Sequence, residues 1–191
     1  MTLEGIITEN NLNDFWIEGG TDKASEHSYC PYYEQLLTPY KDKECEILEV
    51  GCWQGGFVFA MSQLLPMAKF TTIDIQDKFS TRLFDLIGAD RITNHQLVNA
   101  YCFKTLKLIE DKQFDIIIDD GTHLVHDEIF LLNNYMKFLK PDGKMVIEDL
   151  DYDNITKLMD NIDDTVYDYN IMDLRNVKGR GDDMLIEITR K

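Results

Sequence analysis

The stretch ILEVGCWQGGF, residues 47–57, places a turn with three glycines between an apolar strand pattern and an apolar helix pattern. Glycines in such a turn let backbone N–H groups and a helix N-terminus come close to a bound ligand. A dinucleotide-binding turn would read G-x-G-x-x-G, and Trp53 stands where its middle glycine would be. The stretch therefore predicts a strand–turn–helix unit that binds a small polar ligand, and it argues against a nicotinamide cofactor.

Downstream of this stretch, β-branched runs alternate with amphipathic stretches, a pattern typical of β–α–β units and a parallel sheet. We expect strands at Glu46–Val50, Phe70–Ile75, His95–Val98, Phe114–Asp119, Lys144–Glu148, Tyr167–Asp173 and Met184–Thr189. We expect helices at Gly56–Leu65, Phe79–Ile87, Phe103–Glu110, His126–Leu139 and Asn154–Asn161.

Two loops complete the predicted topology. Residues 140–143, KPDG, predict a turn between a helix and the next strand, because Pro fixes φ and Gly permits positive φ. Residues 176–181 are too few for a crossover helix, so the last two strands are expected to be antiparallel. The prediction is a doubly wound, Rossmann-like α/β fold: a seven-stranded, mainly parallel sheet with helices on both faces and an antiparallel last strand.

The chain length of 191 residues suits one domain. Residues 1–44 are polar and aromatic, with a break at Gly19-Gly20 and a predicted helix at Tyr32–Leu37. We expect a helical cap or lid in this part and the ligand-binding core in residues 45–191.

The charge balance and the cysteines limit the classes of function that the chain can have. The chain has 19 Lys and Arg against 35 Asp and Glu, a net charge of -16, so nucleic acid is not an expected partner. An acidic surface of this kind suits a small neutral or sugar-like substrate and concentrates divalent cations. The four cysteines show no C-x-x-C spacing, and neither a signal peptide nor a membrane span is evident. We expect a cytoplasmic protein without a membrane partner.

Two carboxylates near the glycine turn point to the ligand. Glu49 directly precedes the first glycine of the turn, Gly51, and Asp74 closes the second predicted strand. A carboxylate after strand two is the common partner of a ribose diol in this topology, and Glu49 suits an ammonium group. S-adenosylmethionine carries both groups. The alternative is that Gly51 and Gly55 serve only a tight turn.

Four further carboxylates follow the fourth and fifth predicted strands, as Asp119-Asp120 and Glu148-Asp149. The carboxyl ends of parallel strands meet at one edge of the sheet, so these groups should converge. Because they would repel one another, a hard cation such as Mg²⁺ is expected, held by Asp120, Glu148 and Asp149. Asp119 would orient a loop or the cofactor. The alternative is that these acids cap helices or face solvent.

Several motifs occur together along the chain: Gly20-Thr21-Asp22-Lys23, His27-Ser28-Tyr29, the 49–56 turn, Asp119-Asp120-Gly121-Thr122-His123, Glu148-Asp149, Asp173-Leu174-Arg175 and Asp182-Asp183. With these motifs the sequence resembles class I S-adenosylmethionine-dependent methyltransferases, and more narrowly the sugar O-methyltransferase family of macrocin and mycinamicin type. The resemblance implies methyl transfer to a sugar or glycan hydroxyl of a small molecule. It also implies that the N-terminal motifs fold over the cofactor.

The resemblance also assigns roles to two loop residues. His123, three residues after Asp120, would act as general base on a hydroxyl bound beside the metal, with Asp120 as its catalytic partner. Asn99, after the third strand, would contact the adenine. A homodimer, through the lid or the last antiparallel strand, is an expectation from fold-level analogy alone.

Three other functions remain open at this level. A non-catalytic module would bind the adenosyl ligand without turnover. A nicotinamide-dependent oxidoreductase would need the missing G-x-G-x-x-G turn. A metal-dependent catechol or phenol methyltransferase would place its ligands at the same strand ends, and only its acceptor would differ.

Overall fold

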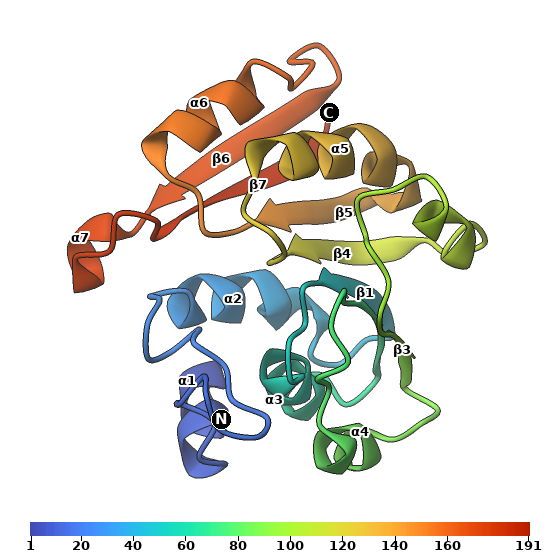
Figure 1. Cartoon of the computed structure of the whole chain (residues 1–191), viewed down its shortest axis with the longest axis vertical. Coiled ribbons are helices and arrows are strands. Elements are labelled where there is room, and N and C mark those ends of the chain that lie inside the picture. The colour runs from blue at the N-terminus through green and yellow to red at the C-terminus, as the bar shows by residue number, and fades with distance from the viewer.

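Seven strands form one sheet in the order β3-β2-β1-β4-β5-β7-β6 in the computed structural model, which describes residues 1–191 (Figure 1). The strands are β1 (Cys45–Val50), β2 (Ala68–Ile73), β3 (Ile92–His95), β4 (Phe114–Asp119), β5 (Leu139–Ile147), β6 (Tyr167–Asp173) and β7 (Met184–Arg190). The first five are parallel, and β7 runs antiparallel to both of its neighbours. This confirms the predicted sheet with its reversed last strand.

Helices cover both faces of the sheet. They are α1 (Leu3–Glu9), α2 (Cys30–Leu37), α3 (Gly56–Leu64), α4 (Thr81–Ile87), α5 (Val125–Tyr135), α6 (Tyr152–Met159) and α7 (Arg175–Lys178), with 3-10 turns at Thr38–Tyr40, Thr105–Leu108 and Met136–Phe138. Figure 1 shows α1 to α4 on one side of the sheet and α5 and α6 on the other. None of these helices has the length and apolar character of a membrane-spanning segment.

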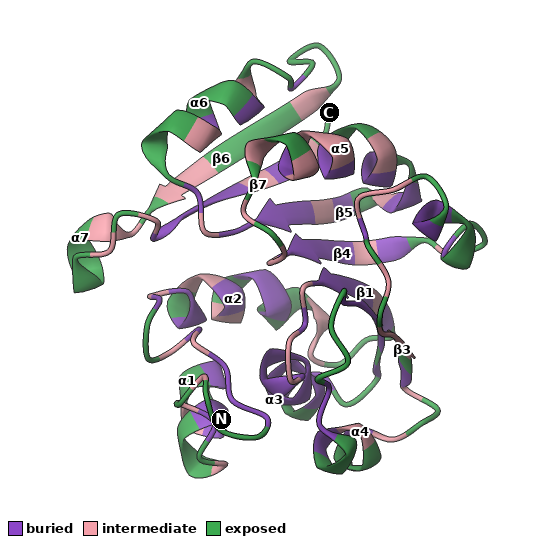
Figure 2. Cartoon of the chain, viewed as in Figure 1, coloured by how far each residue is buried: buried purple, intermediate pink, exposed green.

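The central strands are buried on both faces, as Figure 2 shows for β4 and β5. Neighbouring residues of β4 enter different cores: Ile116 and Ile118 pack with α1 to α4, whereas Ile117 packs with α5 and α6. This alternation follows from the two-residue period of a strand, and it explains why β4 reads as a continuous apolar run.

The third strand lies earlier than expected. The prediction of His95–Val98 is wrong, because Ile92–His95 pairs with Phe70–Ile73 of β2. Ile92 is buried in the core, whereas Leu97 is 72% exposed and has a positive φ of 57°. Sheet pairing therefore selects the segment with the buried residue, and the more apolar segment after it becomes a loop.

Two other local predictions are wrong. Residues 103–110 form only the short 3-10 turn at Thr105–Leu108, and the Thr105 hydroxyl donates to the Asn99 carbonyl that precedes this turn. Residues 140–143 are not a turn before a strand but a bulge inside β5, since the register jumps between the Phe114 and Ile116 pairings. An ion pair of 2.6 Å between Lys140 Nζ and Asp115 Oδ2 holds this bulge on β4.

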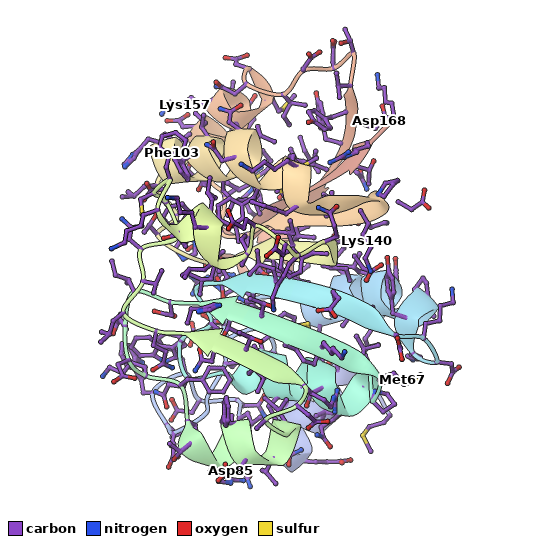
Figure 3. All side chains as sticks on the ribbon, turned by 90° about the vertical axis from the view of Figure 1, so that its right-hand side faces the viewer. Met67, Asp85, Phe103, Lys140, Lys157 and Asp168 are labelled. Carbon is purple, nitrogen blue, oxygen red and sulfur yellow. The ribbon has the colours of Figure 1, made fainter.

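The N-terminal part packs on the core. α2 matches the predicted helix, but α1 was not predicted from the sequence; its Leu3, Ile6 and Ile7 are buried in the core that also contains α3. Figure 3 turns the molecule by 90° from the view of Figure 1 and labels Met67 and Lys140 at the edge where β2 and β5 begin. The candidate site lies at the opposite edge, where the parallel strands end.

Candidate active site

A cavity of about 280 Å³ opens at the carboxyl ends of the parallel strands. The wall residues at the ends of the first two strands are Val50, Gly51 and Trp53 for β1 and residues 73–76 for β2. The other wall residues are residues 98–101 after β3, residues 120–123 after β4, Asp149 after β5, and Phe15 and Asp22 from the N-terminal part. In open α/β sheets, ligands bind in the crevice at this edge, where the strand order reverses. Here the order reverses between β1 and β4.

Gly51 is the residue of the turn that the backbone after β4 approaches closely. Its φ is +79°, and a Cβ at this position would lie 1.9 Å from the carbonyl oxygen of Asp120. Gly55 is the N-cap of α3 with φ +82°, and a Cβ there would meet the ring of Phe79. Both glycines are therefore required by the backbone, and only Gly51 borders the cavity.

Glu49 presents a buried carboxylate without a partner. Its side chain borders a small side cavity shared with Gly51, Asp22 and Asp120. The residue is 2% exposed and its Oε2 has no hydrogen-bond partner. Burial raises the pKa of Glu49 to about 8, against the opposing effect of Lys23. A buried acceptor of this kind fits a ligand that brings a positive charge or a hydrogen-bond donor.

Two more of the predicted cofactor residues border the main cavity. Asp74 accepts hydrogen bonds from the backbone N–H groups of Trp53 (2.8 Å) and Gln76 (2.7 Å), which orients its carboxylate at the end of β2. Asn99 lies after β3 and its Oδ1 accepts from the N–H of Tyr101. Carboxylate oxygens have lone pairs beyond these bonds, so Asp74 retains acceptors for a diol.

Asp119 lies beneath the cavity rather than in its wall. It is buried, one carboxylate oxygen accepts from the Tyr101 hydroxyl at 2.6 Å, and the other has no partner. Burial raises the pKa of Asp119 to about 7, although the Tyr101 hydrogen bond opposes this. Through Tyr101, which borders the cavity, Asp119 orients the wall after β3.

Three groups that can hold a cation converge at the cavity wall. Asp120, His123 and Asp149 each offer one ligand atom, and these atoms lie within 4.8 Å of one another. His123 Nε2 is 3.7 Å from Asp149 Oδ2, and both residues have a φ of 55°. Burial lowers the pKa of His123 below 6.5, although Asp149 opposes this. The donor set fits a hard divalent ion, with two carboxylates and one imidazole.

Glu148, the other predicted ligand, is not part of this group. Its side chain is fully buried, with Oε2 2.7 Å from the ammonium of Lys23 and Oε1 accepting from the Tyr33 hydroxyl. Lys23 Nζ is also 2.6 Å from Asp120 Oδ2. Burial by itself would lower the pKa of Lys23, but Asp120 and Glu148 hold that pKa well above its usual value.

The N-terminal part supplies contacts that the sequence reasoning did not assign. Tyr29 donates from its hydroxyl to Asp149 Oδ1 at 2.8 Å. His27 Nδ1 lies 3.4 Å from the same oxygen and 3.3 Å from Asp183 Oδ1. The signal was present as the quoted Thr-Asp-Lys and His-Ser-Tyr motifs, but a sequence does not show which strand end such side chains reach.

Aromatic rings close one side of the cavity. Phe15 stacks on Trp53 with ring centroids 5.0 Å apart, and Trp53 Nε1 donates to the Phe15 carbonyl at 3.3 Å. Both rings border the cavity. The Trp53 ring is therefore part of the ligand-facing wall.

The fold and the position of this site are typical of class I, S-adenosylmethionine-dependent methyltransferases. The Methyltransferase domain family matches residues 41–178 of the chain. The protein therefore belongs to the Methyltransferase domain family.

Two curated relatives are named as O-methyltransferases. The chain is 26% identical over 137 residues to demethylmacrocin O-methyltransferase of Streptomyces fradiae, covering 66% of this chain and 33% of that protein. It is 24% identical over 131 residues to mycinamicin VI 2''-O-methyltransferase of Micromonospora griseorubida, covering 65% and 32%. The chain thus spans about a third of the length of these relatives.

Solved structures share the fold. MycE methyltransferase, in complex with Mg, SAH and mycinamycin VI, aligns with a TM-score of 0.63 at 23% identity over 78% of this chain and 39% of MycE. A protein of Staphylococcus aureus assigned to the caffeoyl-CoA O-methyltransferases aligns with a TM-score of 0.63 at 16% identity over 100% of this chain and 93% of its own. At these identities the likeness concerns the fold.

Proposed function

We propose that the chain transfers a methyl group from S-adenosylmethionine to a hydroxyl of a sugar or glycosylated small molecule, with the help of Mg²⁺. The observation that carries this proposal is one cavity bordered both by the cofactor-type strand ends, Gly51 and Asp74, and by the acid–base group of Asp120, His123 and Asp149. The family match and the relatives named for O-methyl transfer support the reaction type. The four free cysteines agree with a cytoplasmic location.

The cofactor would lie along the glycine turn. Glu49 would accept from its ammonium group and Asp74 from its ribose diol, while Asn99 would contact the adenine. Gly51 and Gly55 would let the backbone approach it, and Asp119 would orient Tyr101 beside it. Phe15 and Trp53 would exclude water from this end of the cavity.

The cation would be held by Asp120 and Asp149, with Glu148 as the third ligand predicted from the sequence. A bound divalent ion lowers the pKa of a coordinated hydroxyl and stabilises the developing alkoxide. His123 Nε2 would take the hydroxyl proton while the oxygen attacks the methyl carbon and the sulfonium accepts the bonding electron pair. Its lowered pKa leaves the ring neutral at pH 7, the form that can accept a proton.

A phenolic acceptor is the second candidate function. The structure assigned to the caffeoyl-CoA O-methyltransferases covers the whole chain and 93% of its own length, whereas MycE extends far beyond this chain. A compact planar phenol is the acceptor that this second candidate implies.

The proposal is tested by calorimetric titration of S-adenosylmethionine and its demethylated product, followed by turnover on matched panels of sugars and catechols with and without Mg²⁺. We expect binding of both nucleosides, at least tenfold weaker binding in Glu49→Gln, and turnover reduced roughly 10²–10⁴-fold in His123→Gln. The exposed His126→Gln is the matched control. Absence of nucleoside binding would refute the methyltransferase proposal, and turnover on catechols alone would select the second candidate.

A further inference from the structure

Asp149 has an unusual backbone conformation at the point where β5 ends. Its φ is 55°, in the left-handed region, although it is not a glycine. Its side chain is 13% exposed and borders the main cavity. Such a conformation persists only where the surrounding structure determines it. The contacts of Asp149 therefore identify the groups that aim its carboxylate at the cavity.

One tyrosine from the N-terminal part contacts Asp149 at two points. The Tyr29 hydroxyl donates to Asp149 Oδ1 at 2.8 Å and accepts from the Asp149 backbone N–H at 3.2 Å. A phenol oxygen can donate one hydrogen bond and accept another at the same time. The other acceptors near this hydroxyl, the carbonyl oxygens of Asp182 and Met184, are farther away, at 3.4 and 3.5 Å. A single oxygen atom thus restrains both the main chain and the side chain of Asp149.

Tyr29 is itself held in place by packing. It is fully buried, and its ring stacks on His27 with ring centroids 4.8 Å apart. Lys23 Nζ lies 5.7 Å from the centroid of the Tyr29 ring. The Tyr29 carbonyl accepts from the N–H of Tyr33 at 3.0 Å, which ties the residue to the first turn of α2. The position of the phenol oxygen is therefore set by α2 and the surrounding core.

The two carboxylate oxygens of Asp149 have different surroundings. Oδ1 accepts the hydrogen bond from Tyr29 and lies 3.4 Å from His27 Nδ1. Oδ2 lies 3.7 Å from His123 Nε2, and His123 borders the cavity. Oδ2 is therefore the oxygen on the side of the cavity, while Oδ1 is bonded to the N-terminal part of the chain.

We propose that Tyr29 is a positioning residue for the cation: its hydroxyl holds Asp149 in the left-handed conformation and turns Oδ2 of that carboxylate toward the metal. This inference rests on the proposed function, since Asp149 is one of the proposed cation ligands, and it leaves the roles of Asp120 and Glu148 unchanged. Hydrogen-bond partners that orient metal ligands typically contribute roughly 10–100-fold to metal affinity.

Binding of Mn²⁺ to the full chain, measured by electron paramagnetic resonance without nucleoside or acceptor, tests this inference. We expect Tyr29→Phe, which keeps the ring and removes the hydroxyl, to bind Mn²⁺ roughly 10–100-fold more weakly. Its binding of the demethylated nucleoside should stay within about twofold of the wild type, because Tyr29 does not border the cavity. A purely structural role would weaken binding of both, so an equal loss of nucleoside binding overturns the proposal, as does unchanged Mn²⁺ binding.

Tyr32→Phe is the matched control. It removes a hydroxyl that donates to a carboxylate oxygen of Glu187 at 2.9 Å, and neither residue borders the cavity. We expect this variant to bind Mn²⁺ as the wild type does. A loss equal to that of Tyr29→Phe would mean that any phenol-to-carboxylate bond of this part of the chain has the same effect, and it would overturn the proposal.

A second comparison leaves Tyr29 in place, in case Tyr29→Phe fails to fold. Asp149→Glu keeps the charge but places the carboxylate one methylene farther from the backbone, out of register with the Tyr29 hydroxyl. We expect it to bind Mn²⁺ at least tenfold more weakly than the wild type, as Asp149→Asn should. Binding of Mn²⁺ by Asp149→Glu at the wild-type level, or no binding by the wild type itself, overturns the proposal. Nucleoside titration in metal-free buffer checks the proposed function separately, so the failure of one is distinguishable from the failure of the other.

Discussion

Strained backbone concentrates around the cavity at the residue scale. Trp53, His123 and Asp149 have positive φ values of 47°, 55° and 55°, although none of them is glycine. Each such residue costs about 1–3 kcal/mol and persists only where its surroundings determine its conformation. All three follow strand ends and border the cavity, so the strain is located where ligand-facing side chains must be aimed.

Gly51→Ala should destabilise the protein by about 1–3 kcal/mol and weaken nucleoside binding. Its φ of +79° disfavours any side chain, and the new Cβ would lie 1.9 Å from the Asp120 carbonyl oxygen. Urea denaturation and calorimetry measure the two effects. Gly181→Ala is the control, because a Cβ there meets nothing within 4 Å. Equal stability of the two variants would contradict the close-approach role of Gly51.

Glu128 is a buried carboxylate outside the cavity, and it makes stability depend on pH. It is 2% exposed, both of its carboxylate oxygens lack partners, and burial, followed by repulsion from Asp119, raises its pKa to about 8. Between its ordinary pKa of 4.5 and about 8, the folded state binds more protons than the unfolded state. The contribution of Glu128 to the free energy of unfolding is therefore lost as pH rises through that range.

Glu128→Gln should raise the melting temperature at pH 8, corresponding to about 1–3 kcal/mol, and the difference from wild type should shrink toward pH 5. The neutral amide removes the ionisation that destabilises the folded state at high pH. Melting curves at pH 5 and 8 measure this, with the exposed Glu110→Gln as control. A difference that grows toward pH 5 would show that the sign is wrong.

At the scale of elements, the loop between α1 and α2 connects two parts of the site. Its Phe15 stacks on Trp53 of the glycine turn, and its Lys23 reaches the ends of β4 and β5. The same loop is held from the other side by Lys178 Nζ, which donates to the carbonyl oxygen of His27 at 2.6 Å. The loop is therefore a wall of the cavity rather than a separate unit beside it.

Phe15→Ala should weaken binding of the demethylated nucleoside roughly two- to tenfold, because an aromatic pair contributes about 0.5–1.5 kcal/mol beyond its buried area. The stacked Phe15 ring keeps Trp53 oriented at the cavity. Calorimetric titration measures the change. Trp16→Ala is the neighbouring control, since Trp16 is 80% exposed. If the control weakens binding as much, the effect belongs to the loop in general and not to the stacked pair.

For the whole molecule, the net charge of -16 acts against compactness. Like charges on a folded chain lie closer together than on an unfolded one, so repulsion destabilises the folded state. The screening length falls from about 30 Å at 0.01 M to about 8 Å at 0.15 M ionic strength. Added salt can therefore screen much of this repulsion.

Raising NaCl from 0.01 to 0.15 M should increase the melting temperature by roughly a few degrees, since screening relieves repulsion among the excess carboxylates. MgCl₂ at equal ionic strength should add a further increase that Asp149→Asn removes, because only a bound cation is linked to that site. Differential scanning calorimetry measures both. A fall in melting temperature with NaCl would mean that favourable ion pairs outweigh the net repulsion.

Local sequence patterns determined the fold class and identified the strand ends at which the site residues lie. The apolar runs at β1 and β4 and the glycine turn predicted the doubly wound sheet, because burial on both faces imposes a continuous apolar run. The same patterns placed Gly51, Asp74 and Asp120 at one edge, since all parallel strands end there. The predictions failed for short segments such as β3. The boundaries of β3 are decided by its pairing with β2 and not by local hydrophobicity.

The tertiary structure alone decided how the carboxylates after β4 and β5 are divided. Glu148 and Asp149 are adjacent in the sequence, but one side chain points to Lys23 and Tyr33 while the other reaches the cavity. The residues that divide them come from more than 100 positions earlier in the chain. The periodicity of apolar residues in the sequence indicates which face of a helix or strand a residue occupies. The partner of a buried charge depends instead on contacts between distant segments, and only the folded chain specifies these contacts.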